Sequence, residues 1–316
     1  MTFKEADDWK ESDKDPNHLR PDNQLFSPLD TILPATPRNP LCGEGHYEIC
    51  DDWNVEVQTR SLSPEEKINP EDKIVLCVGD SFTFCDGIYY KDTWTKHLQD
   101  SIYKDYKVIN VGIRGASNTL ITNILSKYCN KYGNQIENVI CGFSFNARRT
   151  YFTSRTEENK LQQSTVNISP GHSWNPTNLR IVTKIQTAFE TLNTEENDQS
   201  DFQRNLLLVK GLSKIHNMKV FWWTMQEWGD YDSWKYNKDY RETLESYDFT
   251  YMNITSDIDR IMKQNKITGE EMQISKEDGH MSKKGNWVMA EAMKRYLTFN
   301  KDNPPTDMVH YGIDGC

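Results

Sequence analysis

Residues 73–81 read Lys73-Ile-Val-Leu-Cys-Val-Gly-Asp-Ser81. The run from Ile74 to Val78 is apolar without interruption, which is typical of a strand that is buried on both faces of a parallel sheet. A glycine, a carboxylate and a hydroxyl follow that run directly. Ligands of such sheets bind beyond the carboxyl ends of the strands, so the stretch predicts a core strand that ends in chemically functional residues.

Similar apolar runs recur along the chain and alternate with segments of helical periodicity. Trp94, Leu98 and Ile102, for example, stand at four-residue spacing, which places them on one face of a helix. Strands that alternate with helices are typical of a doubly wound sheet, and we predict an α/β fold of three layers around a mainly parallel sheet. Further strands are expected at 108–111, 138–143 and 219–224, and helices at 92–104, 116–132, 202–217, 254–265 and 283–298.

The two ends of the chain and one internal segment differ from this regular part. Eight of the twelve prolines precede residue 71, so we predict that residues 1–70 form a loop-rich extension, followed by a main domain over 71–300 and a tail over 301–316. Inside the main domain, residues 150–200 are predicted to be an insertion that forms a lid or rim. We expect the insertion to be irregular at 150–177 and 193–201 and helical near 178–192.

Composition and charge limit the partners. The chain has 316 residues, 36% of them hydrophobic, and a formal net charge of -10. An acidic surface repels phosphate backbones, which argues against nucleic acid as a partner. No apolar run reaches the length of a membrane span, and Met1 to Pro16 is charged where a signal peptide is apolar. We therefore expect a chain that is cytoplasmic or is part of an exported assembly.

Patterns for binding metals and phosphates are absent from the sequence. The seven cysteines and the histidines show no ligand spacing, so no metal and no cofactor is expected. Cys77 and Cys141 fall inside predicted strands, which favours buried, reduced thiols, whereas a bridge between Cys42 and Cys50 stays open. No phosphate loop follows a strand. The nucleophile elbow Gly-x-Ser-x-Gly is not formed either, because Thr83 stands where the second glycine is needed.

Three predicted strand ends are rich in glycine, serine and asparagine, and a fourth polar segment, Asp278-Gly-His280, precedes the last helix. Because parallel strands end at the same edge of a sheet, we expect these segments to converge. Together they supply a hydroxyl, backbone donors, an amide and an imidazole with a carboxylate, which are the parts of an acyl-transfer site. The strand ends are Gly79–Ser81, Asn110–Asn118 and Phe143–Arg148.

Four segments also resemble, in order, the sequence blocks of the SGNH (GDSL) hydrolases, a flavodoxin-like family of esterases, lipases, deacetylases and some acyltransferases. One block alone is unspecific, whereas four in order are specific. The segments are Gly79-Asp-Ser-Phe-Thr83, Asn110-Val-Gly-Ile-Arg-Gly115-Ala-Ser, Phe143-Ser-Phe-Asn146 and Asp278-Gly-His-Met-Ser-Lys-Lys-Gly285.

This resemblance implies a role for five residues. The Ser81 hydroxyl attacks the acyl carbon, His280 is its general base, and Asp278 orients the imidazole. The oxyanion hole is formed by the backbone N–H groups of Ser81 and Gly115 and by the side chain of Asn146.

The chain departs from the family pattern at three points. The family often shows Asp-x-x-His, whereas Asp278 is one residue closer to the histidine; Glu277 occupies the usual offset and is the alternative triad acid. Gly112 is an alternative to Gly115 in the second block. In the third block, Ala147 stands where an aspartate commonly follows the asparagine.

Further polar and aromatic residues have two readings. Asn118 and Arg148 are candidates for binding substrate, and the alternative is that each satisfies backbone groups. Asp80 is expected to be a structural hydrogen-bonding residue. Trp222 and Trp223 are expected to face opposite sides of a buried strand, both in the core.

Together these residues predict a serine hydrolase that cleaves carboxylic esters of a small acyl group, such as O-acetyl on a carbohydrate, through an acyl-serine intermediate. Its partner is then a small-molecule or glycan ester. Two alternatives stay open. One is an acyltransferase with the same site, and the other is a virion or surface assembly protein that carries this domain and assembles through its N-terminal extension.

Overall fold

The computed structural model describes residues 68–85, 88, 90–113, 115–144, 148–157, 160–168, 195–224, 249–274 and 280–298. The expected extension before residue 68, the helix near 178–192 and the tail over 301–316 lie outside these residues, as do Cys42 and Cys50.

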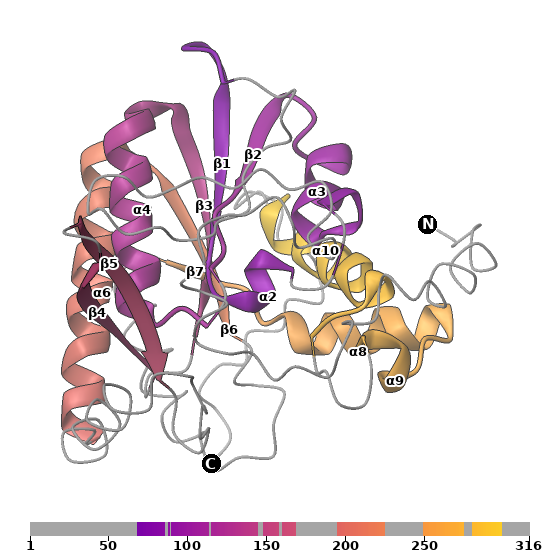
Figure 1. The fold of residues 1–316 in the computed structure, drawn as a ribbon. Helices are drawn as coiled ribbons and strands as arrows, with labels where there is room; N and C mark the ends of the chain where they lie inside the picture. Colours follow the sequence, from indigo (N-terminus) through magenta and orange to yellow (C-terminus); the bar gives the residue numbers. More distant parts are fainter. Residues whose placement is uncertain are drawn as a thin grey trace.

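Five parallel strands form the central sheet (Figure 1). Their order is β2-β1-β3-β6-β7, which is the 2-1-3-4-5 order of flavodoxin-like sheets. The chain reverses its direction of progress between β1 and β3, and such a switch point is where ligands bind. The predicted fold class is confirmed. The strands are β1 (Lys73–Val78), β2 (Tyr106–Asn110), β3 (Ile136–Phe143), β6 (Lys219–Thr224) and β7 (Thr250–Tyr251).

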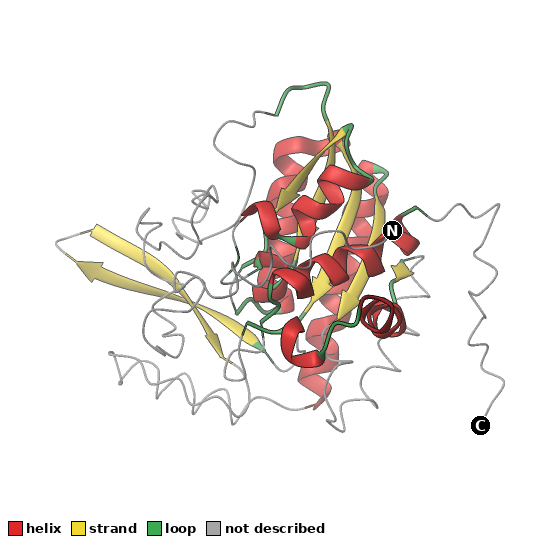
Figure 2. Cartoon of the chain, turned by 90° about the vertical axis from the view of Figure 1, so that its right-hand side faces the viewer, coloured by secondary structure: helices red, strands yellow, loops and turns green. Residues whose placement is uncertain are grey.

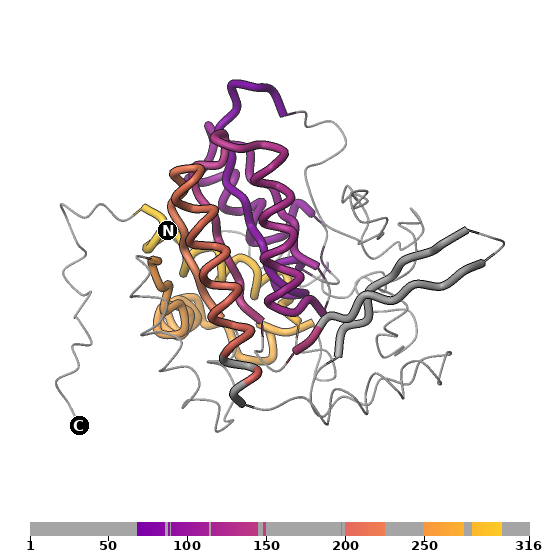
Figure 3. The backbone as a smooth tube through the Cα atoms, turned by 90° about the vertical axis from the view of Figure 1, so that its left-hand side faces the viewer, coloured from indigo at the N-terminus to yellow at the C-terminus, as the bar shows by residue number. Residues whose placement is uncertain are grey.

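Helices cover both faces of the sheet and make three layers (Figures 1 and 3). Ile74, Leu76 and Val78 pack with α4 (Asn118–Tyr132) and α6 (Glu195–His216) on one face. Val75 and Cys77 pack on the other face with three helices, because successive side chains of a strand point to opposite sides. Those helices are α3 (Trp94–Ser101), α8 (Ile254–Asn265) and α10 (Lys283–Leu297), and the short elements are α2 (Ser81–Phe84), α9 (Gly269–Met272), η4 (Tyr90–Asp92) and η5 (Gly133–Gln135).

The two tryptophans of β6 lie in the core on opposite faces, as predicted. The ring centroids of Trp222 and Tyr251 are 4.3 Å apart, and Trp222 belongs to the cluster under α4 and α6. Trp223 meets Trp94 edge to face at 6.3 Å on the side of α3 and α10. The predicted burial of Cys77 and Cys141 is also confirmed: both side chains are fully buried as free thiols, and burial raises the pKa of each.

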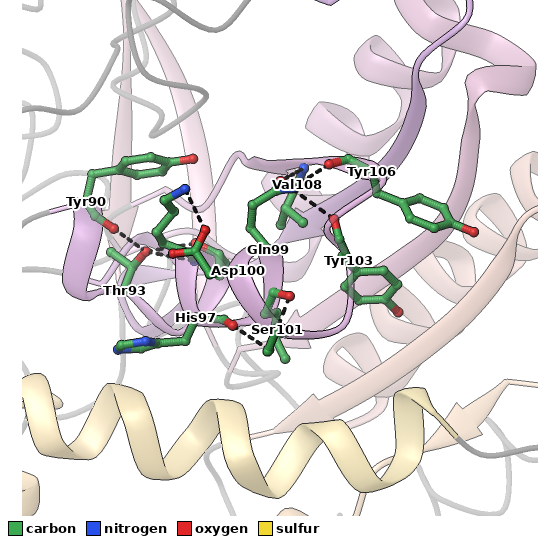
Figure 4. A network of polar contacts seen from close by, with 12 residues as sticks. Tyr90, Thr93, His97, Gln99, Asp100, Ser101, Tyr103, Tyr106 and Val108 are labelled. Carbon is green, nitrogen blue, oxygen red and sulfur yellow. Dashed lines mark hydrogen bonds and ion pairs between the residues drawn. The ribbon is translucent and has the colours of Figure 1, made fainter. Parts of the chain in front are cut away.

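Polar contacts of Gln99 close the outer edge of β2 (Figure 4). Its amide nitrogen donates to the carbonyls of Tyr103 at 2.9 Å and Tyr106 at 2.6 Å, and its oxygen accepts from the Val108 N–H at 2.7 Å. An edge strand leaves backbone groups without a neighbouring strand. One glutamine on α3 therefore satisfies the first half of β2 and fixes the α3–β2 turn.

Several element bounds match the sequence pattern, and the caps explain the small differences. The strands at 73–78 and 219–224 and the helix at 254–265 are as predicted. The helices expected from 92 and 116 begin slightly later, because Thr93 and Ser117 cap them: each hydroxyl accepts a backbone N–H of the first turn.

The expectation of irregular structure at 150–177 and 193–201 was wrong for the described part. β4 (Arg149–Glu157) and β5 (Lys160–Ile168) form an antiparallel hairpin that extends away from the sheet (Figure 2). The sequence of this hairpin shows no regular alternation of apolar and polar residues, which is the usual signal of a strand. Its register pairs Thr153 with Ser164 and Arg155 with Gln162.

Helix α6 begins at Glu195 and not near 202. Its first turns carry acidic and amide residues that have no apolar face to show, so periodicity missed them. Acidic residues stabilise a helix N-terminus because their negative charge is attracted to the positive end of the helix dipole. Arg149 also forms an ion pair with Asp201 at 3.2 Å. The expected start at 202 marked only the point where the helix meets the core.

Candidate active site

Ser81 stands beyond the carboxyl end of strand β1, beside the switch point. It is the first residue of α2, and Asp80 is the cap of that short helix: the Asp80 carboxylate accepts the Phe82 N–H at 3.1 Å. The Trp94 indole of α3 donates to the carbonyl of Phe82 at 3.1 Å. Both neighbours of Ser81 are thus fixed by hydrogen bonds, and Ser81 itself is only 9% exposed.

The loop after β2 lies directly against α2. Asn110, which is fully buried, donates to the Thr83 carbonyl at 2.7 Å and accepts the Gly112 N–H at 3.0 Å. A Cβ on Gly112 would lie 2.2 Å from the backbone nitrogen of Phe84. Gly115 has φ of 65°, a conformation that disfavours other residues. The two glycines of the block therefore have different roles. Gly112 lets the loop after β2 approach the backbone of α2 closely, and Gly115 allows the turn with positive φ.

We expect Gly112→Ala to lower the free energy of unfolding by roughly 3 kcal/mol, because its methyl group meets backbone and not a side chain that can rotate away. Thermal unfolding measures this. Gly211→Ala in α6 is the matched control, since a Cβ there meets nothing within 4 Å; alanine in a helix should leave stability unchanged or raise it. Equal melting temperatures for the two variants would contradict the close approach.

The loop after β3 is held by Asn118, the first residue of α4. Its side chain accepts the Ser144 N–H at 2.8 Å and donates to the Ser144 carbonyl at 3.1 Å. These contacts match the reading in which Asn118 satisfies backbone groups, and a role in substrate binding stays a prediction. Asn146 lies outside the described residues; the two hydrogen bonds of Asn118 fix Ser144, which lies two residues before it in the sequence.

Arg148 points inward toward Asp80. The two form an ion pair of 3.1 Å in which the side chains are 12% and 7% exposed. The same guanidinium nitrogen, Nη1, donates to the Ser144 hydroxyl at 2.8 Å. Burial lowers the pKa of Arg148, and the charge of Asp80 opposes that shift. The structural role predicted for Asp80 is observed, since its carboxylate joins the ends of β1 and β3.

His280, which lies far from Ser81 in the sequence, packs against Phe82. Its ring centroid lies 5.1 Å from that of Phe82, the residue that follows Ser81. The His280 carbonyl accepts the Ile274 N–H at 2.9 Å, and Gln273 pairs with Met281 in an isolated bridge. Backbone pairing of His280 and Met281 with residues 273 and 274 therefore helps to hold this histidine beside Phe82.

Sequence reasoning missed Asn286, which anchors the histidine loop. This fully buried residue of α10 accepts the Trp94 N–H at 3.0 Å. Its amide nitrogen donates to the carbonyls of Met281 at 3.1 Å and Ser282 at 3.0 Å. It thus ties the residues after His280 to the start of α3. An asparagine on the apolar face of a predicted helix was the available signal, because a buried amide needs partners.

An ion pair adds to this anchor. Lys284 of α10 contacts the Glu271 carboxylate of α9 at 2.5 Å, and this hydrogen bond lowers the pKa of Glu271. Asp278 and Glu277, the two candidates for the triad acid, lie outside the described residues. Within the described ranges, no three acidic, histidine or cysteine side chains gather as a metal would require, and no helix is long and apolar enough to cross a membrane.

Comparisons with known proteins return structures only. No family model and no curated protein matches the sequence. The solved structures that resemble the chain include SGNH and GDSL proteins. Those proteins match over almost their whole length, at low identity and with TM-scores below 0.5.

Three of these structures illustrate the range. A GDSL-like lipase from Parabacteroides merdae has 16% identity and a TM-score of 0.42, over 72% of this chain and 98% of its own. A lipolytic protein of the G-D-S-L family from Desulfitobacterium hafniense has 14% identity and a TM-score of 0.44, over 71% of this chain and 99% of its own. An acetylxylan esterase from Geobacillus stearothermophilus has 14% identity and a TM-score of 0.44, over 74% of this chain and 98% of its own.

Proposed function

We propose that the chain is a serine hydrolase that cleaves carboxylic esters through an acyl-serine intermediate. One observation carries the proposal: Ser81 follows β1 at the switch point, and the ring of His280 packs on the ring of the next residue, Phe82. A hydroxyl needs a base near it to act as a nucleophile at neutral pH. The packing of His280 on Phe82 supports His280 as that base.

The reaction has two halves. In the first, the Ser81 oxygen forms a bond to the acyl carbon while His280 takes its proton, and the alcohol leaves with that proton. The negative charge on the carbonyl oxygen is stabilised by the N–H groups of Ser81 and Gly115 and by the amide of Asn146. In the second half, water attacks the acyl-serine and gives its proton to His280, which releases the acid and restores the serine.

The acyl group is proposed to be small, with O-acetyl on a carbohydrate as the favoured substrate. Ser81 is only 9% exposed, and the rings of Phe82 and His280 stand beside it; both features favour a short acyl chain. An alcohol that replaces water in the second half would make the chain an acyltransferase. The rate of deacylation, measured with and without sugar acceptors, separates hydrolysis from transfer.

A fluorophosphonate probe tests the proposal directly. Such a probe forms a stable bond to a serine that is activated as a nucleophile. We expect one probe per chain, attached to the peptide that contains Ser81 as read by mass spectrometry. Absence of labelling, or labelling of another serine, would show that Ser81 is not an activated nucleophile.

The triad acid is testable by a matched pair of variants. We propose Asp278 for this role, and expect Asp278→Asn to reduce kcat by about 10⁴-fold, since the amide no longer holds the productive tautomer of the imidazole. Glu277→Gln should keep most of the activity on p-nitrophenyl acetate. The reverse ranking of the two variants would transfer the role to Glu277.

A further inference from the structure

The side chain of Arg148 joins three loops of the candidate site. Its Nη1 atom contacts the Asp80 carboxylate at 3.1 Å, the Ser144 hydroxyl at 2.8 Å and the Ala116 carbonyl at 3.4 Å. Asp80 follows β1, Ala116 lies in the loop after β2, and Ser144 follows β3. One cation therefore reaches the ends of three neighbouring strands.

Each of these contacts lies beside a residue of the proposed chemistry. Asp80 precedes the nucleophile Ser81, Ala116 follows Gly115, and Ser144 lies two residues before Asn146 in the sequence. Ser144 and Arg148 thus flank Asn146 in the sequence, and Arg148 donates to the Ser144 hydroxyl at 2.8 Å.

Through Asp80, Arg148 is also connected to Phe82, the residue that follows the nucleophile. One carboxylate oxygen of Asp80 accepts from Arg148 and from the Ser144 hydroxyl at 3.0 Å, while the other accepts the Phe82 N–H. The ion pair is shielded from water, with side chains 12% and 7% exposed. Buried pairs of this kind hold their geometry, because separating them leaves a charge without compensation.

We propose that Arg148 is a positioning residue that holds the nucleophile and the oxyanion-hole donors in register, and that it does not bind substrate. This inference rests on the proposed function. Donors stabilise a transition state only when they are already aimed at the place where charge develops, and a misplacement of about 1 Å can cost about 10²-fold in rate. The planar guanidinium presents donors at fixed angles, which the point charge of lysine does not reproduce.

The test uses four variants of the full chain: Arg148→Met, Arg148→Lys, the double variant Asp80→Asn/Arg148→Met, and Arg295→Met. The last is a matched control, since Arg295 forms a comparably buried ion pair with Asp257, with side chains 20% and 1% exposed, between α10 and α8. The readouts are kcat and KM on p-nitrophenyl acetate, the rate constant of fluorophosphonate labelling, and the melting temperature.

We expect Arg148→Met to lower kcat and the labelling rate about 10²-fold, with KM changed by about twofold or less. Arg148→Lys should not restore the rate, because the flexible lysine stem keeps the charge and does not hold its ammonium in the fixed position of the Arg148 Nη1 atom. The double variant removes both charges of the ion pair, so its melting temperature should be higher than that of Arg148→Met, while its kcat should stay as low. Arg295→Met should lose melting temperature and keep kcat.

Three results would overturn the inference. Wild-type kcat in a folded Arg148→Met variant would show that the contacts of Arg148 are not needed for catalysis. Recovery of kcat in the double variant would assign the effect to the unpaired Asp80 alone. A raised KM with unchanged kcat would make Arg148 a substrate contact. The variants are interpreted only after the wild-type protein has been shown to be labelled at Ser81. If the wild-type protein is not labelled, the proposed function is wrong. If it is labelled and any of these three results is found, only the role proposed for Arg148 is wrong.

Discussion

Ser81→Ala is expected to reduce kcat on p-nitrophenyl acetate by about 10⁴–10⁶-fold. Alanine keeps the backbone N–H of position 81, which belongs to the proposed oxyanion hole, and removes only the atom that forms the acyl bond. The melting temperature should stay close to that of the wild type, because Asp80 caps α2 through the N–H of Phe82 and not through the serine hydroxyl. Steady-state kinetics and thermal unfolding measure the two effects.

Ser213→Ala provides the control for this substitution. Ser213 has the same exposed fraction of 9%, and its hydroxyl donates to the Lys210 carbonyl within α6. Loss of that hydroxyl should leave kcat unchanged. A Ser81→Ala enzyme with more than a few per cent of the wild-type rate would remove the acyl-serine from the mechanism.

His280→Ala is expected to cause a loss of similar size, about 10⁴–10⁶-fold in kcat. The reason is shared dependence: without a base the serine hydroxyl keeps its proton, and without the serine the base has nothing to activate. The double variant Ser81→Ala/His280→Ala should therefore be no slower than either single variant. Kinetics of the three variants on one substrate form the cycle that measures this coupling.

His216→Ala is the matched control for the histidine, because His216 lies in the last turn of α6, on the helix layer opposite α10. Its removal should leave kcat unchanged. Losses that add in the double variant would show that Ser81 and His280 act separately, and the histidine would then have to be reassigned.

Much of the fold follows from local pattern. The continuous apolar run of β1 and the run that includes Trp222 in β6 could be read as buried strands, because burial on both faces leaves no alternative to apolar side chains. The four-residue spacing of α3 and the caps Thr93 and Ser117 are equally local signals. The β4–β5 hairpin and the first turns of α6 escaped detection, since their sequences show no regular apolar periodicity.

The candidate site divides in the same way. The residue types and their order named Ser81 and His280, since each stands at a predicted strand end or loop with the chemistry that acyl transfer needs. Asn286 and the partner of Arg148 could not be named, because hydrogen bonds between distant segments leave no periodic trace in a sequence. For Arg148 the sequence left two readings open, a contact to substrate or the satisfaction of backbone groups; its guanidinium contacts in the structure are with Asp80, Ser144 and the Ala116 carbonyl.

The amino-acid sequence by itself determined which strands are buried, the approximate positions of α3 and α4 and that a serine follows the first strand, because each of these depends on neighbouring residues and on water. Only the tertiary structure decided the strand order β2-β1-β3-β6-β7, which puts that serine at the switch point. It also set the 5.1 Å between the rings of Phe82 and His280 and turned Arg148 inward onto Asp80. These features depend on which distant segments pack together, and that choice is made by the whole core at once.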